Sequence, residues 1–207
     1  MARAFISLGL VMCVGATAAA APTLAMVSAI KANRLSLREL ADARARDVTP
    51  VATQHPSCVY ILERHQRVAA PRSEVFAFYA DAANLEQMTP NGLGFTILTP
   101  QPIDMRAGAR IDYRIKLHGI PLTWRTLIEQ FEPEDRFVDV QLEGPYSVWR
   151  HTHTFADAEG GGTELGDRVV YEMPLGPLGR IAHALFVKRQ LEQIFDYRER
   201  VMAERFG

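Results

Sequence analysis

Two histidines spaced two residues apart are the part of the chain best suited to chemistry. His151 and His153 alternate with Trp149 and Phe155 in the stretch 147–155. In an extended strand every second side chain points to the same side, so these four share one face. A face with two imidazoles between large aromatic rings is typical neither of an apolar core nor of a solvated surface. It indicates the wall of a mostly apolar cavity with a few polar groups pointing inward, as in small-molecule sites.

A carboxylate on the next predicted strand, Asp167, can reach these imidazoles. If residues 156–162 close a hairpin with Phe155 pairing near Thr163, His151 lies opposite Asp167; a two-residue shift places His153 there instead. Such a carboxylate fixes the tautomer of an imidazole and raises its basicity, as a general base requires. The three residues are therefore candidates for catalysis, for ligand contact, or for a hydrogen-bonded network with neither role.

The same three side chains could supply the ligands of an open zinc site. The other histidines cannot complete it, because His65, His118 and His183 belong to separate predicted elements. We therefore expect no metal. The sequence also lacks a Gly-x-Gly-x-x-Gly motif, a phosphate loop and a Gly-x-Ser-x-Gly elbow. We expect no cofactor and no serine nucleophile.

Aromatic residues on other predicted strands could line the same cavity. Tyr113 alternates with charged neighbours, so it should point inward, while Trp124 falls on an apolar face. Tyr171 shares a face with Asp167. Core packing is an alternative for Tyr113 and Trp124 that the sequence leaves open. The residues predicted to contact a ligand are Tyr113, Trp124, Trp149, His151, His153, Asp167 and Tyr171.

The elements that position these residues follow from hydrophobic periodicity. Period-two runs separated by turn residues predict seven strands, at residues 58–68, 93–99, 109–117, 122–131, 136–143, 147–155 and 163–173. The short connections between the later strands indicate an antiparallel meander. Two short helices should follow the first strand, one starting at Pro71 and one at residues 82–88, and residues 178–206 predict a long helix. Its apolar stripe changes phase near residues 183–188, which predicts a kink or a short break.

From about Val59 onward the chain resembles the START-like, helix-grip superfamily (SRPBCC), which includes polyketide cyclase/dehydrase and coenzyme Q-binding proteins. The matching features are residues 70–78, Asp81 with Asn84-Leu85, the strand with His151 and His153, Gly162-Thr163, and the closing helix. The resemblance implies an α+β fold in which a curved seven-stranded antiparallel sheet wraps a long carboxy-terminal helix.

The same resemblance implies a cavity between sheet and helix for a hydrophobic or aromatic molecule, such as a lipid, a quinone or a polyketide. We expect the protein to bind or carry such a molecule. The alternative is a cyclase or dehydratase in which His151 or His153 acts as a base with Asp167.

Composition excludes some partners. The 207 residues include 23 Lys and Arg against 24 Asp and Glu, for a formal charge of −1. This balance gives no electrostatic reason to expect nucleic acid. Cys13 and Cys58 have neither metal-binding nor redox spacing, so the sequence predicts no disulfide framework.

The amino-terminal part divides into two segments before the domain at residues 58–207. Residues 4–30 carry no charge and could be a cleaved signal, a membrane anchor, or an artefact if translation starts at Met26. Basic residues follow this segment more densely than they precede it, which favours an anchor with the domain in the cytoplasm over export. Residues 31–57 read as a helical and linker segment. Association with a membrane through residues 4–30 is therefore our expectation, whereas the oligomeric state cannot be inferred.

Overall fold

The computed structural model describes residues 58–117 and 119–207. In chain order its elements are strand β1 (Val59–Val68), helix α3 (Arg72–Ala80), 3₁₀ turns η1 (Ala82–Leu85) and η2 (Asn91–Leu93), strands β2 (Thr96–Ile97), β3 (Arg110–Leu117), β4 (Ile120–Glu132), β5 (Arg136–Glu143), β6 (Val148–Asp157) and β7 (Thr163–Glu172), helix α4 (Pro177–Ala182), π-helical turn η3 (His183–Val187) and helix α5 (Lys188–Phe206). The predicted amino-terminal anchor and linker lie outside these residues.

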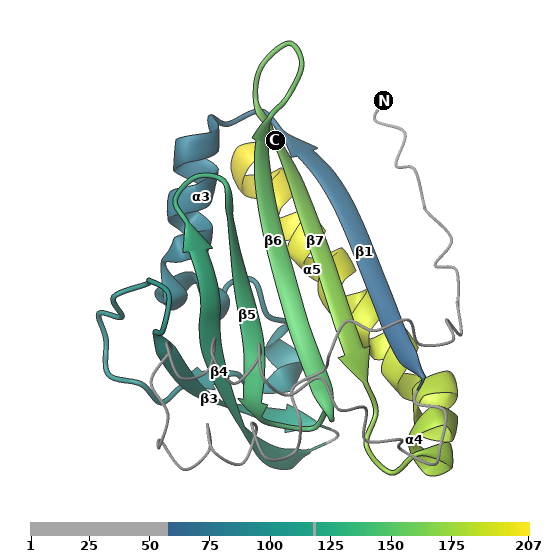
Figure 1. The fold of residues 1–207 in the computed structure, drawn as a ribbon. Coiled ribbons are helices and arrows are strands. Elements are labelled where there is room, and N and C mark those ends of the chain that lie inside the picture. The colour runs from purple at the N-terminus through teal and green to yellow at the C-terminus, as the bar shows by residue number, and fades with distance from the viewer. Residues whose placement is uncertain (1–57, 118) are drawn as a thin grey trace, which may run out of the picture.

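The strands form one antiparallel sheet in the order β1-β7-β6-β5-β4-β3-β2. The sheet curves around α5, and α3 lies near the carboxy-terminal end of that helix (Figure 1). The pairing of β4 with β5 shifts register between Arg125 and Thr126 and again between Ile128 and Gln130. Irregularities of this kind bend a strand and increase its twist, so they contribute to the curvature. The predicted helix-grip fold, with seven strands and a long closing helix, is confirmed.

The closing helix contains the predicted break. Between α4 and α5, the π-helical turn η3 holds one more residue per turn than an α-helix would. This extra residue explains the change of phase in the apolar stripe. His183 in the turn is held from two sides, because its Nε2 lies 2.8 Å from the Tyr171 hydroxyl and its ring stacks on Tyr60 at 3.5 Å between centroids.

Three apolar clusters form the core of the described residues, and the two larger ones pack the sheet against the helices. One lies under α3 and includes Phe76, Phe137, Phe155 and Phe206. The other lies between β1, β7 and α5 and includes Leu62, Val169, Tyr171, Leu191 and Phe195. Aromatic rings dominate the first cluster, which gives it a large buried area for few residues.

Two predicted elements are shorter than expected. The strand predicted at residues 93–99 is reduced to β2, because Asn91–Leu93 form a 3₁₀ turn that ends at Gly94 in a left-handed conformation, with φ +50°. The helix predicted at residues 82–88 is regular only over Ala82–Leu85. None of the helices in the part of the chain that the structure describes has both the length and the apolar character needed to cross a bilayer.

Candidate functional site

Four polar side chains from three neighbouring strands meet on the inner face of the sheet. Asp139 lies on β5, His151 and His153 on β6, and Asp167 on β7. Asp139 pairs with His151 across one ladder, and His153 pairs with Asp167 across the other. Of the two hairpin registers considered from the sequence, the shifted one is therefore correct. Because side chains alternate along a strand, the inward-pointing phase brings all four to the same face.

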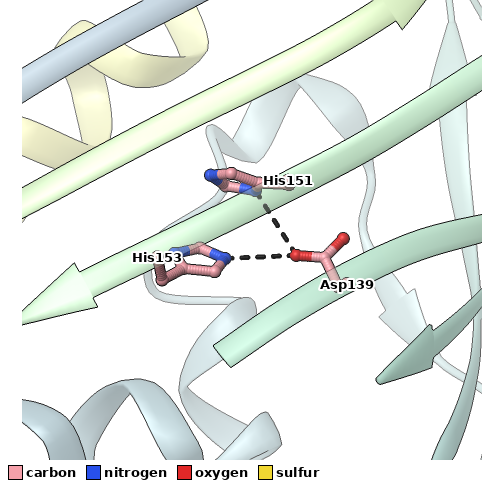
Figure 2. Close-up of side chains that lie close together, drawn as sticks. All are labelled: Asp139, His151 and His153. Atoms are coloured by element: carbon pink, nitrogen blue, oxygen red, sulfur yellow. Dashed lines mark hydrogen bonds and ion pairs between the residues drawn. The ribbon is translucent and has the colours of Figure 1, made fainter. Parts of the chain in front are cut away.

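Each imidazole lies close to both carboxylates. His151 Nε2 is 2.9 Å from Asp167 Oδ1, and His153 Nε2 is 3.1 Å from Asp139 Oδ2, both with hydrogen-bond geometry. The second nitrogens complete the cluster, with His151 Nδ1 3.4 Å from Asp139 Oδ2 and His153 Nδ1 2.9 Å from Asp167 Oδ1. Figure 2 shows the Asp139 side of this arrangement, where one nitrogen of each imidazole points at the carboxylate.

Aromatic rings separate this cluster from solvent. The His153 ring stacks on Phe137 at 4.2 Å between centroids, and His151 meets the edge of Phe195 at 5.4 Å. Only 4% of His151 and 6% of His153 is exposed. Charged groups at this depth lose much of their hydration, so each depends on its partners.

The surroundings shift the pKa values of the two imidazoles in opposite directions. Burial lowers the pKa of His151, and repulsion from His153 lowers it further. Burial also opposes a charge on His153, but its contacts with Asp139 and Asp167 outweigh burial and raise its pKa. Burial acts against both carboxylates too, yet the two imidazoles hold the pKa of Asp139 below its ordinary value and that of Asp167 well below. The surroundings therefore favour positive charge on His153 over His151 and favour the ionised form of both carboxylates.

A cavity of about 150 Å³ lies beside the cluster, between the sheet and α5. Its lining is mostly apolar and includes both tryptophans of the protein. Five of the seven residues predicted to contact a ligand lie on its wall, namely Tyr113, Trp124, Trp149, His151 and His153. The rings of Trp124 and Trp149 meet edge to face at 5.1 Å. The two ring planes are nearly perpendicular, at 88°, and both rings belong to the cavity wall.

The other two predicted contact residues are placed differently. Asp167 does not line this cavity, because it lies behind the two imidazoles. Tyr171 is in the cluster between β7 and α5, where its hydroxyl contacts His183. The sequence places both residues on the correct face of β7. Which residues of that face reach the cavity depends on the curvature of the sheet, which the sequence pattern does not give. Whether any of the seven contacts a ligand stays a prediction.

Sequence reasoning missed two polar residues of the site, Asp139 and Arg198. Both line the cavity. Asp139 is in phase with the buried Phe137 on β5, so a carboxylate on the apolar face was a usable signal. Arg198 falls in line with the buried Leu191 and Phe195 on α5, where a charge interrupts the apolar stripe.

Four buried side-chain atoms of cavity-lining residues have no hydrogen-bond partner in the described part of the protein. They are Trp124 Nε1, Thr126 Oγ1, His153 Nδ1 and Arg198 Nε, and the tryptophan and arginine nitrogens can act only as donors. The Arg198 guanidinium lies 5.0 Å from the centre of the Phe195 ring. Buried donors are normally paired, since an unpaired one costs about 1–3 kcal/mol. The side chains that carry these unpaired groups all belong to residues of the cavity wall.

One set of residues could hold a metal ion. Among the described residues, Asp139, His151 and His153 bring three donor atoms within 4.8 Å of one another. This set differs from the one considered from the sequence, because its carboxylate is Asp139 on β5 and not Asp167 on β7.

Solved structures with the same architecture come from several bacteria. Protein CV1439 from Chromobacterium violaceum matches with a TM-score of 0.54 at 15% identity, over 70% of this chain and 96% of that one. TTHA0849 from Thermus thermophilus matches with a TM-score of 0.53 at 18% identity, over 69% and 96% of the two chains. At these identities the matches show a shared fold and nothing of the ligand.

A third similar structure is the di-domain ARO/CYC protein StfQ from the steffimycin biosynthetic pathway. It matches with a TM-score of 0.58 at 19% identity, over 86% of this chain and 60% of StfQ. No curated protein matches the sequence. The family model described as polyketide cyclase / dehydrase and lipid transport matches residues 68–197, which include the whole polar cluster. The chain therefore belongs to the polyketide cyclase/dehydrase and lipid transport family.

Proposed function

We propose that the protein binds a compact, flat hydrophobic molecule that carries oxygen acceptors, with an aromatic or quinone ring as the best fit. The observation that carries this proposal is the cavity wall, which is mostly apolar and aromatic but contains the unpaired donors Trp124 Nε1 and Arg198 Nε. Binding sites for small molecules are built in this way, with apolar area for affinity and few polar groups for orientation.

The size of the cavity restricts the guest. An apolar cavity of about 150 Å³ is large enough for benzene. The cavity here has about that volume, so it fits one ring rather than a folded polyketide or a whole lipid tail. A larger ligand would place its ring inside and its chain outside the domain.

Trp124 and Trp149 provide the test, since they are the only tryptophans in the chain and both line the cavity. Titration with a substituted benzoquinone should quench their fluorescence saturably. A saturated ring of the same size without oxygen should bind more weakly. The variant Trp124→Phe removes the N–H donor but keeps an aromatic ring, and should weaken quinone binding about 2- to 12-fold, from the 0.5–1.5 kcal/mol of one hydrogen bond.

Native mass spectrometry of the purified chain is the second measurement. A bound small molecule should be released by organic extraction and identified by its mass. If no ring compound quenches saturably and the purified chain carries no guest, the binding proposal is wrong.

A second candidate function is catalysis by cyclisation or dehydration, favoured by the paired imidazoles and carboxylates on the cavity wall. His151, the less basic imidazole, would accept a proton from the guest, and His153 would donate one. The variants His151→Gln, His153→Gln and Asp167→Asn separate the two functions. Lost turnover with retained affinity would establish catalysis, whereas unchanged turnover of every tested substrate would exclude it.

We also propose that residues 4–30 anchor the protein in a membrane, with the domain on the cytoplasmic side. Hydrophobic guests concentrate in the membrane, so the anchor would keep the domain close to them. The uncharged segment and the basic residues after it support this. So do large exposed apolar side chains around α4, among them Leu178 and Ile181. Cell fractionation should find the full chain in the membrane fraction and a chain beginning at Met26 in the supernatant. An intact mass that lacks residues 1–20 would instead identify a cleaved signal and overturn this proposal.

A further inference from the structure

One nitrogen atom of each imidazole, on the side of the ring toward β5, faces the same carboxylate oxygen. His153 Nε2 lies 3.1 Å and His151 Nδ1 lies 3.4 Å from Asp139 Oδ2 (Figure 2). Around a tetrahedral zinc ion with bonds of 2.0–2.1 Å, neighbouring ligand atoms are roughly 3.3 Å apart. The two measured separations lie on either side of that value. The Asp139 oxygen is thus spaced from each of the two nitrogens as neighbouring ligands of one ion are, and all three donor atoms lie within 4.8 Å of one another.

We propose that Asp139, His151 and His153 form a binding site for a divalent transition-metal ion, with Zn²⁺ as the best-matched ion. Two imidazole nitrogens and one carboxylate oxygen are borderline ligands that suit Zn²⁺ better than Mg²⁺ or Ca²⁺, which prefer oxygen ligands alone. The proposal departs from the expectation of no metal drawn from the sequence, because the third donor is Asp139 and not Asp167.

Asp167 occupies the position of an outer-shell partner. Its Oδ1 lies 2.9 Å from His151 Nε2 and 2.9 Å from His153 Nδ1, on the side of each ring away from Asp139. The contact from His151 has hydrogen-bond geometry. Histidines that bind metals usually donate their other N–H to a carboxylate or carbonyl, which fixes the tautomer and the ring orientation. A proton on His151 Nε2 leaves the Nδ1 lone pair free to face the ion.

The charge of the cluster also suits a cation. Asp139 and Asp167 are the carboxylates, and the side chain of Asp139 is 16% exposed and that of Asp167 is 12% exposed. Two carboxylates that contact the same two imidazoles are stabilised by positive charge between them. A divalent ion held by Asp139 and the imidazoles would help to balance the negative charge of both carboxylates.

The ligand set leaves a coordination position for the guest. Asp139, His151 and His153 all line the cavity, so an ion bound by them would be exposed to it. Three protein ligands plus one open position are typical of catalytic zinc sites rather than structural ones. An ion there would coordinate and polarise an oxygen of the bound molecule.

The test uses the full chain, stripped of metal by a chelator and titrated with Zn²⁺ alone by calorimetry. One Zn²⁺ per chain should bind. Co²⁺ added instead should give the visible absorption of a four- or five-coordinate ion, which reports imidazole and carboxylate ligation directly. Asp139→Asn, His151→Gln and His153→Gln should each weaken Zn²⁺ binding more than about 100-fold. Asp167→Asn should weaken it about 10- to 100-fold, as is usual for outer-shell partners.

Matched controls lie on the protein surface. His65→Gln and Asp196→Asn replace the same residue types at exposed positions and should leave Zn²⁺ binding unchanged. If a variant of the cluster fails to fold, the Co²⁺ spectrum of the unmodified chain still decides the question. The proposal is overturned if the unmodified chain binds no stoichiometric Zn²⁺, or if the cluster variants bind it as tightly as the surface controls.

Discussion

Arg198 shows how one residue can join the sheet and the helix at the site. It lies on α5, but its positive charge lowers the pKa of Asp139 on β5, although burial of Asp139 and its contacts with the imidazoles have larger effects. Its Nε has no hydrogen-bond partner in the described protein, and its guanidinium packs over Phe195. Arginine is suited to such a position because its stem packs against apolar groups while its charge persists. A guest with an oxygen in the cavity would supply the missing acceptor.

Replacing this residue tests its role. Arg198→Met keeps much of the stem and removes the donor, so affinity for an oxygen-bearing ring should fall by about 1.5–3 kcal/mol, the usual value of a hydrogen bond to a charged group. Fluorescence titration measures the change. Arg200→Met on the exposed side of the same helix is the control and should bind normally. Equal affinities for the two variants would remove Arg198 from the binding site.

At the scale of elements, the π-helical turn η3 sets the rotation of α5 against the sheet. It inserts one extra residue between α4 and α5, and if the same residues formed a continuous α-helix, every side chain of α5 would be rotated by about 100° about the helix axis. Leu191 and Phe195 would then leave the core, and Arg198 would leave the cavity. The turn is also anchored, through the contact between His183 and Tyr171.

This geometry predicts that single deletions in the closing helix have position-dependent effects. Deleting the exposed Ala184 removes the extra residue, so α4 and α5 can keep their orientations and the midpoint of thermal unfolding should change little. The exposed Arg189 lies beyond the turn. Its deletion should rotate the rest of α5 so that its apolar side chains no longer face the core, and the cooperative thermal unfolding transition should be lost. Circular dichroism during heating measures both. Similar destabilisation by the two deletions would contradict this account of η3.

The sequence predicted the elements better than the contacts between them. Alternation along β6 and β7 was enough to place His151, His153 and Asp167 on one face, because side-chain direction in a strand depends only on its own residues. It could not decide between two hairpin registers, nor bring Asp139 into the cluster, because both depend on pairing between strands. Arg198 was missed for the same reason, since its place at the cavity depends on the turn η3.

At the scale of the whole molecule, the aromatic interior links stability to alkaline pH. Burial raises the pKa of Tyr79, Tyr113, Tyr146 and Tyr171 above the ordinary value of 10.0. Above about pH 10 the unfolded chain releases these protons while the folded chain retains them. The folded state therefore binds more protons, and the free energy of unfolding must fall as the pH rises.

Urea unfolding at a series of pH values measures this effect. Between roughly pH 9 and pH 11 the unmodified chain should lose stability steeply, and the variant Tyr113→Phe should lose less because it has one fewer buried phenol. The phenolate absorbance of these four tyrosines, out of six in the chain, should appear together with unfolding rather than before it. Parallel pH profiles for the two proteins would show that Tyr113 ionises freely in the folded state.

The position of β1 at the edge of the sheet affects whether copies of the molecule associate in concentrated solution. β1 is at one end of the strand order, so one row of its backbone groups pairs with no other described strand. Such an edge invites addition of a strand from another molecule, and charged side chains deter it. Glu63 and Arg67, both exposed on β1, are suited to that role.

Replacing both by valine should therefore produce self-association that increases with concentration, visible by analytical ultracentrifugation. The same replacements at Glu164 and Arg168 on the interior strand β7 add equal apolar surface and should leave a single species. The charges on this border would then act as a barrier against aggregation, separate from whatever the cavity binds.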